Sequence, residues 1–376
     1  MKKIILLAVL FCLTGIIESF SLPRFALRTG GMCIGCHVNP TGGLMRNRGG
    51  WSFGKNVLPM LSPRSEETTL SNYIGDNISY GFDFRGQYLV KMTDSTTRSD
   101  FQRMAASVYT AVNIGEDINI FSRYDFLNDI WEAYAVAQIL PNGGYIKGGS
   151  FTPNYGIRLD DHTAYTRGGD LGLLFQTGQR QGLIYDPYYV EAGVEAGIYF
   201  SDMALLTASV GNPGRSLFTA DPTYTANLMI MPPISDEISL FFGGSAAIFK
   251  QQTLGPNFKP VFPEVTMYGG YLGFRAGDFS LLGEYDMAND YITADSVANA
   301  IMIEAAYRIV KGLEAVLRYD RFDPNDKVDN DDLSRLIIGF EIFPYSFIEI
   351  RPQYRMQIEE PKIDNDSFVM QFHLYY

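Results

Sequence analysis

Long apolar runs, cysteines and histidines are all scarce in this chain of 376 residues. After residue 21 every apolar stretch is soon interrupted by Asp, Arg, Lys, Gly or Gln. A helix that spans a membrane needs about 20 consecutive apolar residues, so a bundle of membrane-spanning helices is excluded. Acidic residues outnumber basic ones by 42 to 30. Such a balance disfavours binding to phosphate backbones, and we predict no nucleic-acid partner.

The one long apolar stretch lies at the N-terminus. Lys2 and Lys3 precede an apolar core from Ile4 to Ile17, and small residues follow at Ser19 and Ser21. This order is typical of a secretory signal peptide. We therefore predict a signal peptide over residues 1–21 and an exported mature chain, which loses Cys12.

Only two cysteines remain in the mature chain, and they lie in the sequence Cys33-Ile34-Gly35-Cys36-His37. This is the attachment pattern of c-type haem. Two thiols at this spacing can bond to the two vinyl groups of one haem, and the adjacent imidazole then reaches the iron. A disulfide would not require the histidine, and a zinc site would need further ligands. We predict one covalently bound haem c, with thioether bonds to Cys33 and Cys36 and His37 as the proximal ligand.

The second axial ligand of the iron is left open by the sequence, because the chain has only three histidines. His162 is the leading candidate, since two neighbouring aspartates are available to orient its ring. Met45, Met60 and His373 are the alternatives. An ordinary hydrogen-bonded role for His162 and His373 also stays open.

From residue 75 onward, apolar and polar residues alternate in runs separated by turn signals, which is typical of β-strands. Aromatic residues crowd the ends of these runs, and the last run places Phe372, Leu374 and Tyr376 on one face. A soluble β-sandwich would show the same period but would need no aromatic residues at its strand ends. The pattern favours an outer-membrane barrel with an apolar outside, aromatic girdles and a polar lumen.

The links between these runs predict how the barrel is built. Short links at residues 115–117, 141–143 and 276–278 alternate with longer polar links, for example 92–100 and 323–332. Outer-membrane barrels have this asymmetry and an even number of strands. We predict an all-β, antiparallel transmembrane barrel of about 16 strands, with 18 as the alternative. Its domains are a signal peptide (1–21), a haem segment (22–74) and the barrel (75–376).

Charge divides unevenly between the haem segment and the barrel. Residues 22–64 contain six basic residues and no acidic one, whereas residues 65–376 contain 22 basic and 41 acidic residues. Opposite charge favours a plug that lies in the barrel lumen or at its periplasmic mouth. A tethered periplasmic cap is the alternative. Arg28 and Arg46 are candidate partners of the haem propionates.

The order of a signal peptide, one haem motif and a porin-like barrel resembles the fused outer-membrane cytochrome–porin family of iron-oxidising bacteria. Residues 22–30 are similar to the lead-in of that family, and His37 matches its proximal ligand. Residues 38–47 depart from its usual pattern, which points to a sister group. Residues 149–156 are similar to a segment of phosphate-selective-type porins that leads into a loop inside the lumen.

This resemblance implies a bacterial outer-membrane protein that carries electrons from an extracellular donor, such as Fe(II), to a periplasmic electron-transfer protein. Outer-membrane lipid would be its third partner. The implied role is electron transfer rather than enzymatic turnover, with iron oxidation left open. A solute porin with a haem-bearing structural or sensory plug is the alternative, and a haem enzyme such as a peroxidase is a third. The sequence predicts no oligomeric state.

Overall fold

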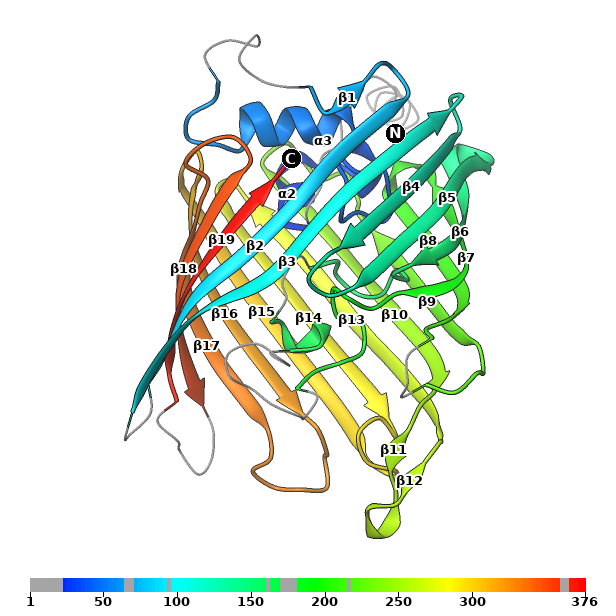
Figure 1. Ribbon diagram of the computed structural model, residues 1–376, viewed down its shortest axis with the longest axis vertical. Helices are drawn as coiled ribbons and strands as arrows, with labels where there is room; N and C mark the ends of the chain where they lie inside the picture. Colours follow the sequence, from blue (N-terminus) through cyan, green and yellow to red (C-terminus); the bar gives the residue numbers. More distant parts are fainter. Residues whose placement is uncertain are drawn as a thin grey trace, which may run out of the picture.

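In the computed structural model, the chain forms a closed antiparallel β-barrel (Figure 1). The structure describes residues 23–63, 71–92, 96–159, 163–169, 181–214, 218–358 and 365–376. Within these ranges the barrel has sixteen strands, which confirms the smaller of the two predicted numbers. The strands are β2 (Ile78–Met92), β3 (Thr97–Ile114), β4 (Ile118–Asp125), β5 (Ile130–Leu140), β6 (Gly144–Phe151), β7 (Glu191–Phe200), β8 (Ala204–Asn212), β9 (Thr223–Ile230), β10 (Ile238–Lys250), β13 (Glu264–Ala276), β14 (Phe279–Asn289), β15 (Val297–Val310), β16 (Leu313–Asp323), β17 (Leu333–Ile342), β18 (Ile348–Ile358) and β19 (Ser367–Tyr375).

Each strand pairs with its sequence neighbours, and β19 closes the barrel on β2 with Phe372 opposite Gly86. Closure removes the exposed strand edges that would otherwise promote aggregation. Three short elements lie outside this ring. β1 (Tyr73–Ile74) adds to β2, and β11 (Thr253–Leu254) pairs with β12 (Pro260–Val261).

The predicted alternation of faces is confirmed. Along β16, the side chains of Glu314, Arg318 and Asp320 are buried on the luminal side, whereas Leu317 is exposed on the outside. Ile303 is likewise exposed on the outer face of β15. A barrel with an apolar exterior and buried charges inside matches the pattern of membrane barrels rather than that of soluble ones.

The two ends of the barrel differ. One end, here the short-turn end, carries tight links such as 115–117, 141–143 and 277–278, as predicted. The other end, here the long-loop end, carries the links at 152–190, 251–263 and 324–332. The prediction of a loop at 92–100 is wrong in part, because β3 already begins at Thr97. Its first residues are polar and exposed, so the strand continues beyond the apolar zone.

The N-terminal segment lies at the short-turn end, within the ring of strands (Figure 1). It contains α2 (Pro23–Thr29), the 3₁₀ turn η1 (Cys33–Gly35), α3 (Arg48–Ser52) and the π-helical turn η2 (Phe53–Val57). Helix α2 ends at Thr29, and the next residue, Gly30, has a φ of +69° and donates its N–H to Ala26 O at 2.8 Å. Leu27 is fully buried and packs in one cluster with barrel aromatics such as Tyr109 and Phe121. No helix in the described part of the chain is long and apolar enough to cross a membrane.

The long link between β6 and β7 also enters the lumen, as its likeness to porin segments suggested. Gly156 N donates to Ser245 Oγ on β10 at 2.8 Å, and Ile157 N donates to Glu284 on β14 at 3.1 Å. The turn η5 (Tyr165–Arg167) supplies Arg167, which pairs with Glu284 at 2.7 Å. These contacts cross from one side of the barrel to the other, so this link narrows the lumen.

Candidate functional site

The Cys33–His37 motif folds as a compact turn. The N–H groups of Cys36 and His37 both donate to Cys33 O, at 3.1 and 3.0 Å. The chain then reverses, and Val38 N donates to Met45 O at 3.1 Å. Asn47 N returns to Cys36 O at 2.8 Å. Local hydrogen bonds therefore hold the motif in shape.

Asn47 joins this turn to helix α3. Its side-chain amide donates to Ile34 O at 2.8 Å, and its carbonyl oxygen accepts from Gly50 N at 3.1 Å as the N-cap of the helix. Gly49 and Gly50 allow the helix to lie directly on the motif. A Cβ at Gly50 would lie 2.2 Å from Cys36 O, and one at Gly49 would lie 2.5 Å from Gly35 O.

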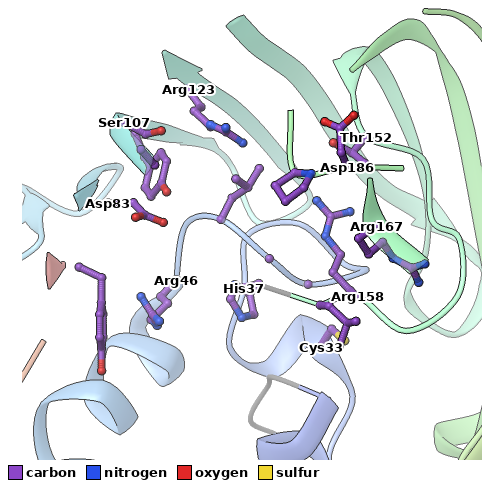
Figure 2. Close-up of a pocket in the computed structure, with 18 of the residues that line it drawn as sticks. Cys33, His37, Arg46, Asp83, Ser107, Arg123, Thr152, Arg158, Arg167 and Asp186 are labelled. Carbon is purple, nitrogen blue, oxygen red and sulfur yellow. The ribbon is translucent and has the colours of Figure 1, made fainter. Parts of the chain in front are cut away.

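A cavity opens beside the motif, within the ring of strands (Figure 2). Its empty volume, which includes the opening to solvent, is about 1140 Å³. Residues of three different elements line it: Cys33, His37 and Arg46 from the N-terminal segment, Tyr155 and Arg158 from the 152–190 link, and Asp83, Ser107, Arg123 and His373 from the barrel wall.

Two glycines bring the 152–190 link close to the motif. Gly42 and Gly43 have φ values of +86° and +77°, which side chains rarely adopt. A Cβ at Gly42 would lie 3.1 Å from Cys33 Sγ, and one at Gly43 would lie 2.6 Å from Arg158 Nε. The Cys33 thiol is partly exposed to the cavity but deep in the lumen. This burial raises the pKa of the thiol to about 11, and the charge of Arg158 opposes the rise.

The structure places the predicted haem ligands in different settings. Cys33 and His37 line the cavity, whereas Cys36 is 2% exposed beneath α3 and lies outside the lining. The second thioether bond would therefore require the Cys36 side chain to turn toward the cavity. His162, the leading candidate for the distal ligand, lies outside the described residues.

The three alternative distal ligands lie apart from one another. Met45 is buried in the cluster around Tyr109, outside the cavity lining. Met60 is exposed beside the Gly312 turn at the short-turn end. His373 does line the cavity, but its two ring nitrogens face Glu349 at 2.8 Å and Asp83 at 3.3 Å.

The two arginines predicted to meet haem propionates also differ. Arg28 pairs with Glu314, with Nη2 to Oε2 at 2.7 Å, and does not line the cavity. Arg46 does line it, and its guanidinium lies 4.3 Å from the ring centre of Tyr375. Of the two, Arg46 is the one placed to meet a ligand of the cavity.

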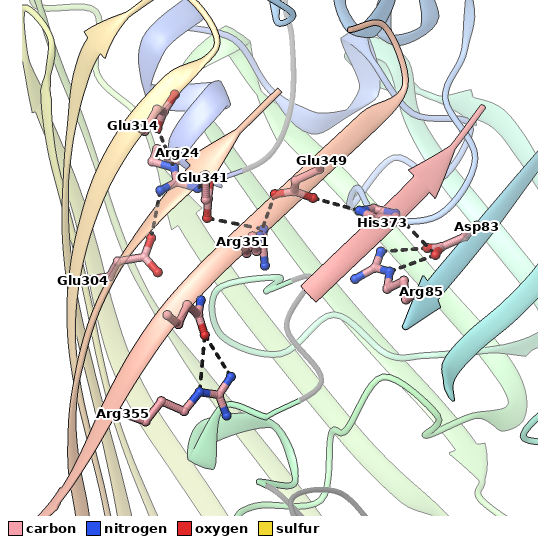
Figure 3. A network of polar contacts seen from close by, with 11 residues as sticks. Arg24, Asp83, Arg85, Glu304, Glu314, Glu341, Glu349, Arg351, Arg355 and His373 are labelled. Carbon is pink, nitrogen blue, oxygen red and sulfur yellow. Dashed lines mark hydrogen bonds and ion pairs between the residues drawn. The ribbon is translucent and has the colours of Figure 1, made fainter. Parts of the chain in front are cut away.

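A chain of ion pairs runs along the luminal wall from the cavity to helix α2 (Figure 3). Arg351 bridges Glu349 at 2.6 Å and Glu341 at 3.4 Å. Arg24 of α2 then pairs with Glu341 and lies 3.5 Å from Glu304. The basic segment thus contacts the acidic wall through its own arginines.

Sequence reasoning missed the role of Arg158 and of the glycine pair beside it. Arg158 lies in the same polar segment as His162, and Gly42 and Gly43 follow the haem motif closely. The glycine pair signals an unusual backbone there. No local sequence pattern could reveal that Arg158, more than a hundred positions away, packs on Gly43.

The barrel has the fold of bacterial outer-membrane channels. OprB of Pseudomonas putida, at high pH, aligns over 80% of this chain and 94% of its own, with 9% identity and a TM-score of 0.61. The outer membrane channel DcaP of Acinetobacter baumannii aligns over 82% and 100%, with 12% identity and a TM-score of 0.55. An anion-selective porin from Comamonas acidovorans aligns over 80% and 98%, with 8% identity and a TM-score of 0.54.

No model of a known protein family and no curated protein matches the sequence. At identities this low, the likeness to solved channels defines the fold alone. The chain is therefore a porin-type β-barrel by fold, and its chemistry must be argued from its own residues.

Proposed function

We propose that this protein is an outer-membrane barrel that carries one haem c in its lumen and passes electrons from an extracellular donor, such as ferrous iron, to a periplasmic carrier. The single observation that carries the proposal is the position of Cys33 and His37, which line the same luminal cavity. The apolar outer face supports the membrane location.

The asymmetry of the barrel supports the proposed orientation. In outer-membrane barrels the short turns face the periplasm and the longer loops face outward. The N-terminal segment and the C-terminus both lie at the short-turn end. Cys33 and His37 would then be near the periplasmic side, where an electron carrier can approach. An extracellular donor would have to enter from the long-loop end.

The residues of the motif fit a haem, provided that the Cys36 side chain turns toward the cavity. Cys33 and Cys36 would hold it covalently and His37 would ligate its iron, while Arg46 and Arg158 offer positive charge within the same cavity. A haem c bound there supplies a one-electron iron couple whose potential depends on axial ligation and burial. The protein contributes the fixed position of the motif through Asn47 and α3.

The test is a reduced-minus-oxidised spectrum of the full-length protein extracted from membranes, together with haem staining after denaturing electrophoresis. We expect a c-type spectrum and a stain that survives denaturation, both lost in a Cys33→Ala/Cys36→Ala double variant. A wild-type protein without covalent haem would contradict the proposal.

A solute porin is the second candidate, and the fold favours it directly, because the similar solved structures are outer-membrane channels. In this alternative the N-terminal segment is a structural or sensory plug. Conductance across a planar bilayer that responds to a solute, with no oxidation or reduction of a bound group, would favour the porin over the electron carrier.

A further inference from the structure

Of the four arginines that line the cavity, Arg46 and Arg158 form no ion pair with a described residue, whereas Arg123 and Arg167 do. Arg123 lies 3.5 Å from Glu132, and Arg167 pairs with Glu284 at 2.7 Å. Within the described residues, no carboxylate pairs with Arg158, and its Nη1 is buried without a hydrogen-bond partner. A buried donor left unsatisfied costs about 1–3 kcal/mol. A bound ligand would remove that cost.

The surroundings of Arg158 keep its guanidinium in the cavity. Its Nε packs on Gly43, where the absence of a Cβ makes room for it. Figure 2 shows Arg46 and Arg158 on either side of His37, both among the residues that line the cavity. No ion pair engages Arg46 in the described part of the chain either, because its contact is with the Tyr375 ring. Two guanidinium groups without an ion pair to any described residue therefore lie on either side of His37.

Among the described residues, two carboxylates line the cavity, Asp83 and Asp186, and Asp186 accepts a hydrogen bond from Tyr188 N at 2.8 Å. Asp83 pairs with Arg85 at 2.7 Å and faces His373 at 3.3 Å. Glu132 and Glu284 face the other two arginines. Among the described residues, the guanidinium groups of Arg46 and Arg158 therefore lie beside His37 without an ion pair, although the barrel as a whole is acidic. Guanidinium groups bind carboxylates with paired, charge-assisted hydrogen bonds.

We propose that Arg158, with Arg46, forms a carboxylate-binding site in the luminal cavity. The carboxylates come either from the propionates of the bound haem or from a free organic acid that enters the lumen. The first source rests on the proposed function, whereas the second does not. Of these two arginines, Arg158 is the one on which the site depends, because its Nη1 is buried without a hydrogen-bond partner among the described residues.

The experiment uses the full-length detergent-extracted protein and the variants Arg158→Gln, Arg158→Lys and Gly43→Ala. The alanine Cβ would displace Arg158 without removing its charge. The control is Arg275→Gln, which removes the same charge at the Gly277 turn. Because Arg158 has no ion-pair partner among the described residues, we expect that Arg158→Gln does not lower the unfolding midpoint in guanidinium chloride.

Two measurements separate the sources. If the haem propionates are the ligand, Arg158→Gln makes reduction of the haem about tenfold less favourable, which is 59 mV for a one-electron couple, and Arg158→Lys shifts it less. If a free acid is the ligand, succinate binds the wild-type protein in calorimetry and binds Arg158→Gln and Gly43→Ala about tenfold more weakly. The control changes neither quantity.

These outcomes keep the two proposals distinct. Absence of covalent haem overturns the proposed electron carrier but leaves the succinate measurement decisive for the site. A haem potential unchanged by Arg158→Gln, together with no Arg158-dependent succinate binding, would overturn the carboxylate site. That result would not affect the proposed electron carrier, provided that the protein contains covalent haem.

Discussion

At the scale of single residues, buried arginines connect the N-terminal segment to the wall. Glu314 and Glu341 lie directly opposite each other on β16 and β17, an arrangement that is unfavourable for like charges. Arg24 pairs with Glu341 and lies 3.6 Å from Glu314, and Arg28 also pairs with Glu314. The two arginines are four positions apart, so they share one face of α2. The helix therefore neutralises a repulsive pair in the barrel.

Arg24→Gln leaves these buried glutamates without their central partner. We expect the free energy of unfolding to fall by about 3 kcal/mol, measured by guanidinium denaturation of the protein in detergent. Adding Glu341→Gln should restore much of the loss. The control is Arg48→Gln, whose exposed pair with Asp76 at 3.8 Å is worth less than about 1 kcal/mol. Equal effects of Arg24→Gln and Arg48→Gln would contradict this account.

Gly50 tests the packing of α3 on the haem motif. Alanine usually stabilises a helix relative to glycine, but a Cβ at Gly50 would lie 2.2 Å from Cys36 O. We predict that Gly50→Ala destabilises the protein and lowers the haem stain per molecule. Gly54→Ala is the matched control, since its nearest neighbour would be Phe347 at 3.5 Å, an ordinary contact. Equal stability and equal haem stain of the two variants would show that the close approach of Gly50 to Cys36 O has no role.

His162 remains the predicted distal ligand. His162→Ala should change the spectrum of the oxidised and reduced haem, because loss of an axial ligand alters the ligand field of the iron. His373→Ala is the comparison, since His373 lines the cavity between two carboxylates. A c-type spectrum that is unaffected by His162→Ala would remove this assignment.

At the scale of elements, the 152–190 link depends on one buried arginine. Arg167 pairs with Glu284 and also donates to the backbone oxygens of Tyr155 and Ile157. Arg167 thus connects Tyr155 and Ile157, near the start of the link, to β14. The aromatic rings of Tyr155 and Tyr185, 4.9 Å apart, pack beside it.

Arg167→Gln should free this link from the wall. We expect cleavage within residues 152–190 by an added protease to become at least several times faster, because local opening requires breaking fewer buried contacts. Arg321→Gln serves as the control, since Arg321 is half-exposed at the long-loop end and pairs with Asp332 at 3.1 Å. Protection that is unchanged by Arg167→Gln would mean that other contacts hold the link.

Elements differ in how far sequence could predict them. The strands were predictable because one face meets lipid and the other meets polar side chains, as Leu317 and Arg318 illustrate. The entry of the 152–190 link into the lumen was predictable only by likeness to other porins. The pairing of Arg24 and Arg28 with particular glutamates was not, because charge composition fixes neither strand register nor the depth of a helix.

At the scale of the whole molecule, an acidic barrel encloses a basic segment. A barrel of 16 strands has room for an aqueous channel. Here helix α2 fills part of it and covers glutamates of the wall (Figure 3). The segment is therefore part of the electrostatic balance of the lumen as well as the carrier of the haem motif.

Deletion of residues 22–63 should open the channel. We predict a larger single-channel conductance in planar bilayers and a shift toward cation selectivity under a KCl gradient, because Glu304, Glu314 and Glu341 lose their arginine partners. Conductance and selectivity equal to those of the intact chain would show that residues 22–63 do not obstruct the pore.

The central claim is that this porin-type barrel carries a covalent haem at Cys33 and Cys36. The most direct test is the intact mass of the purified mature protein by mass spectrometry under denaturing conditions. The account predicts the polypeptide mass plus one haem, and the polypeptide mass alone for the Cys33→Ala/Cys36→Ala variant. A wild-type protein of unmodified polypeptide mass, produced in cells that mature c-type cytochromes, would contradict it.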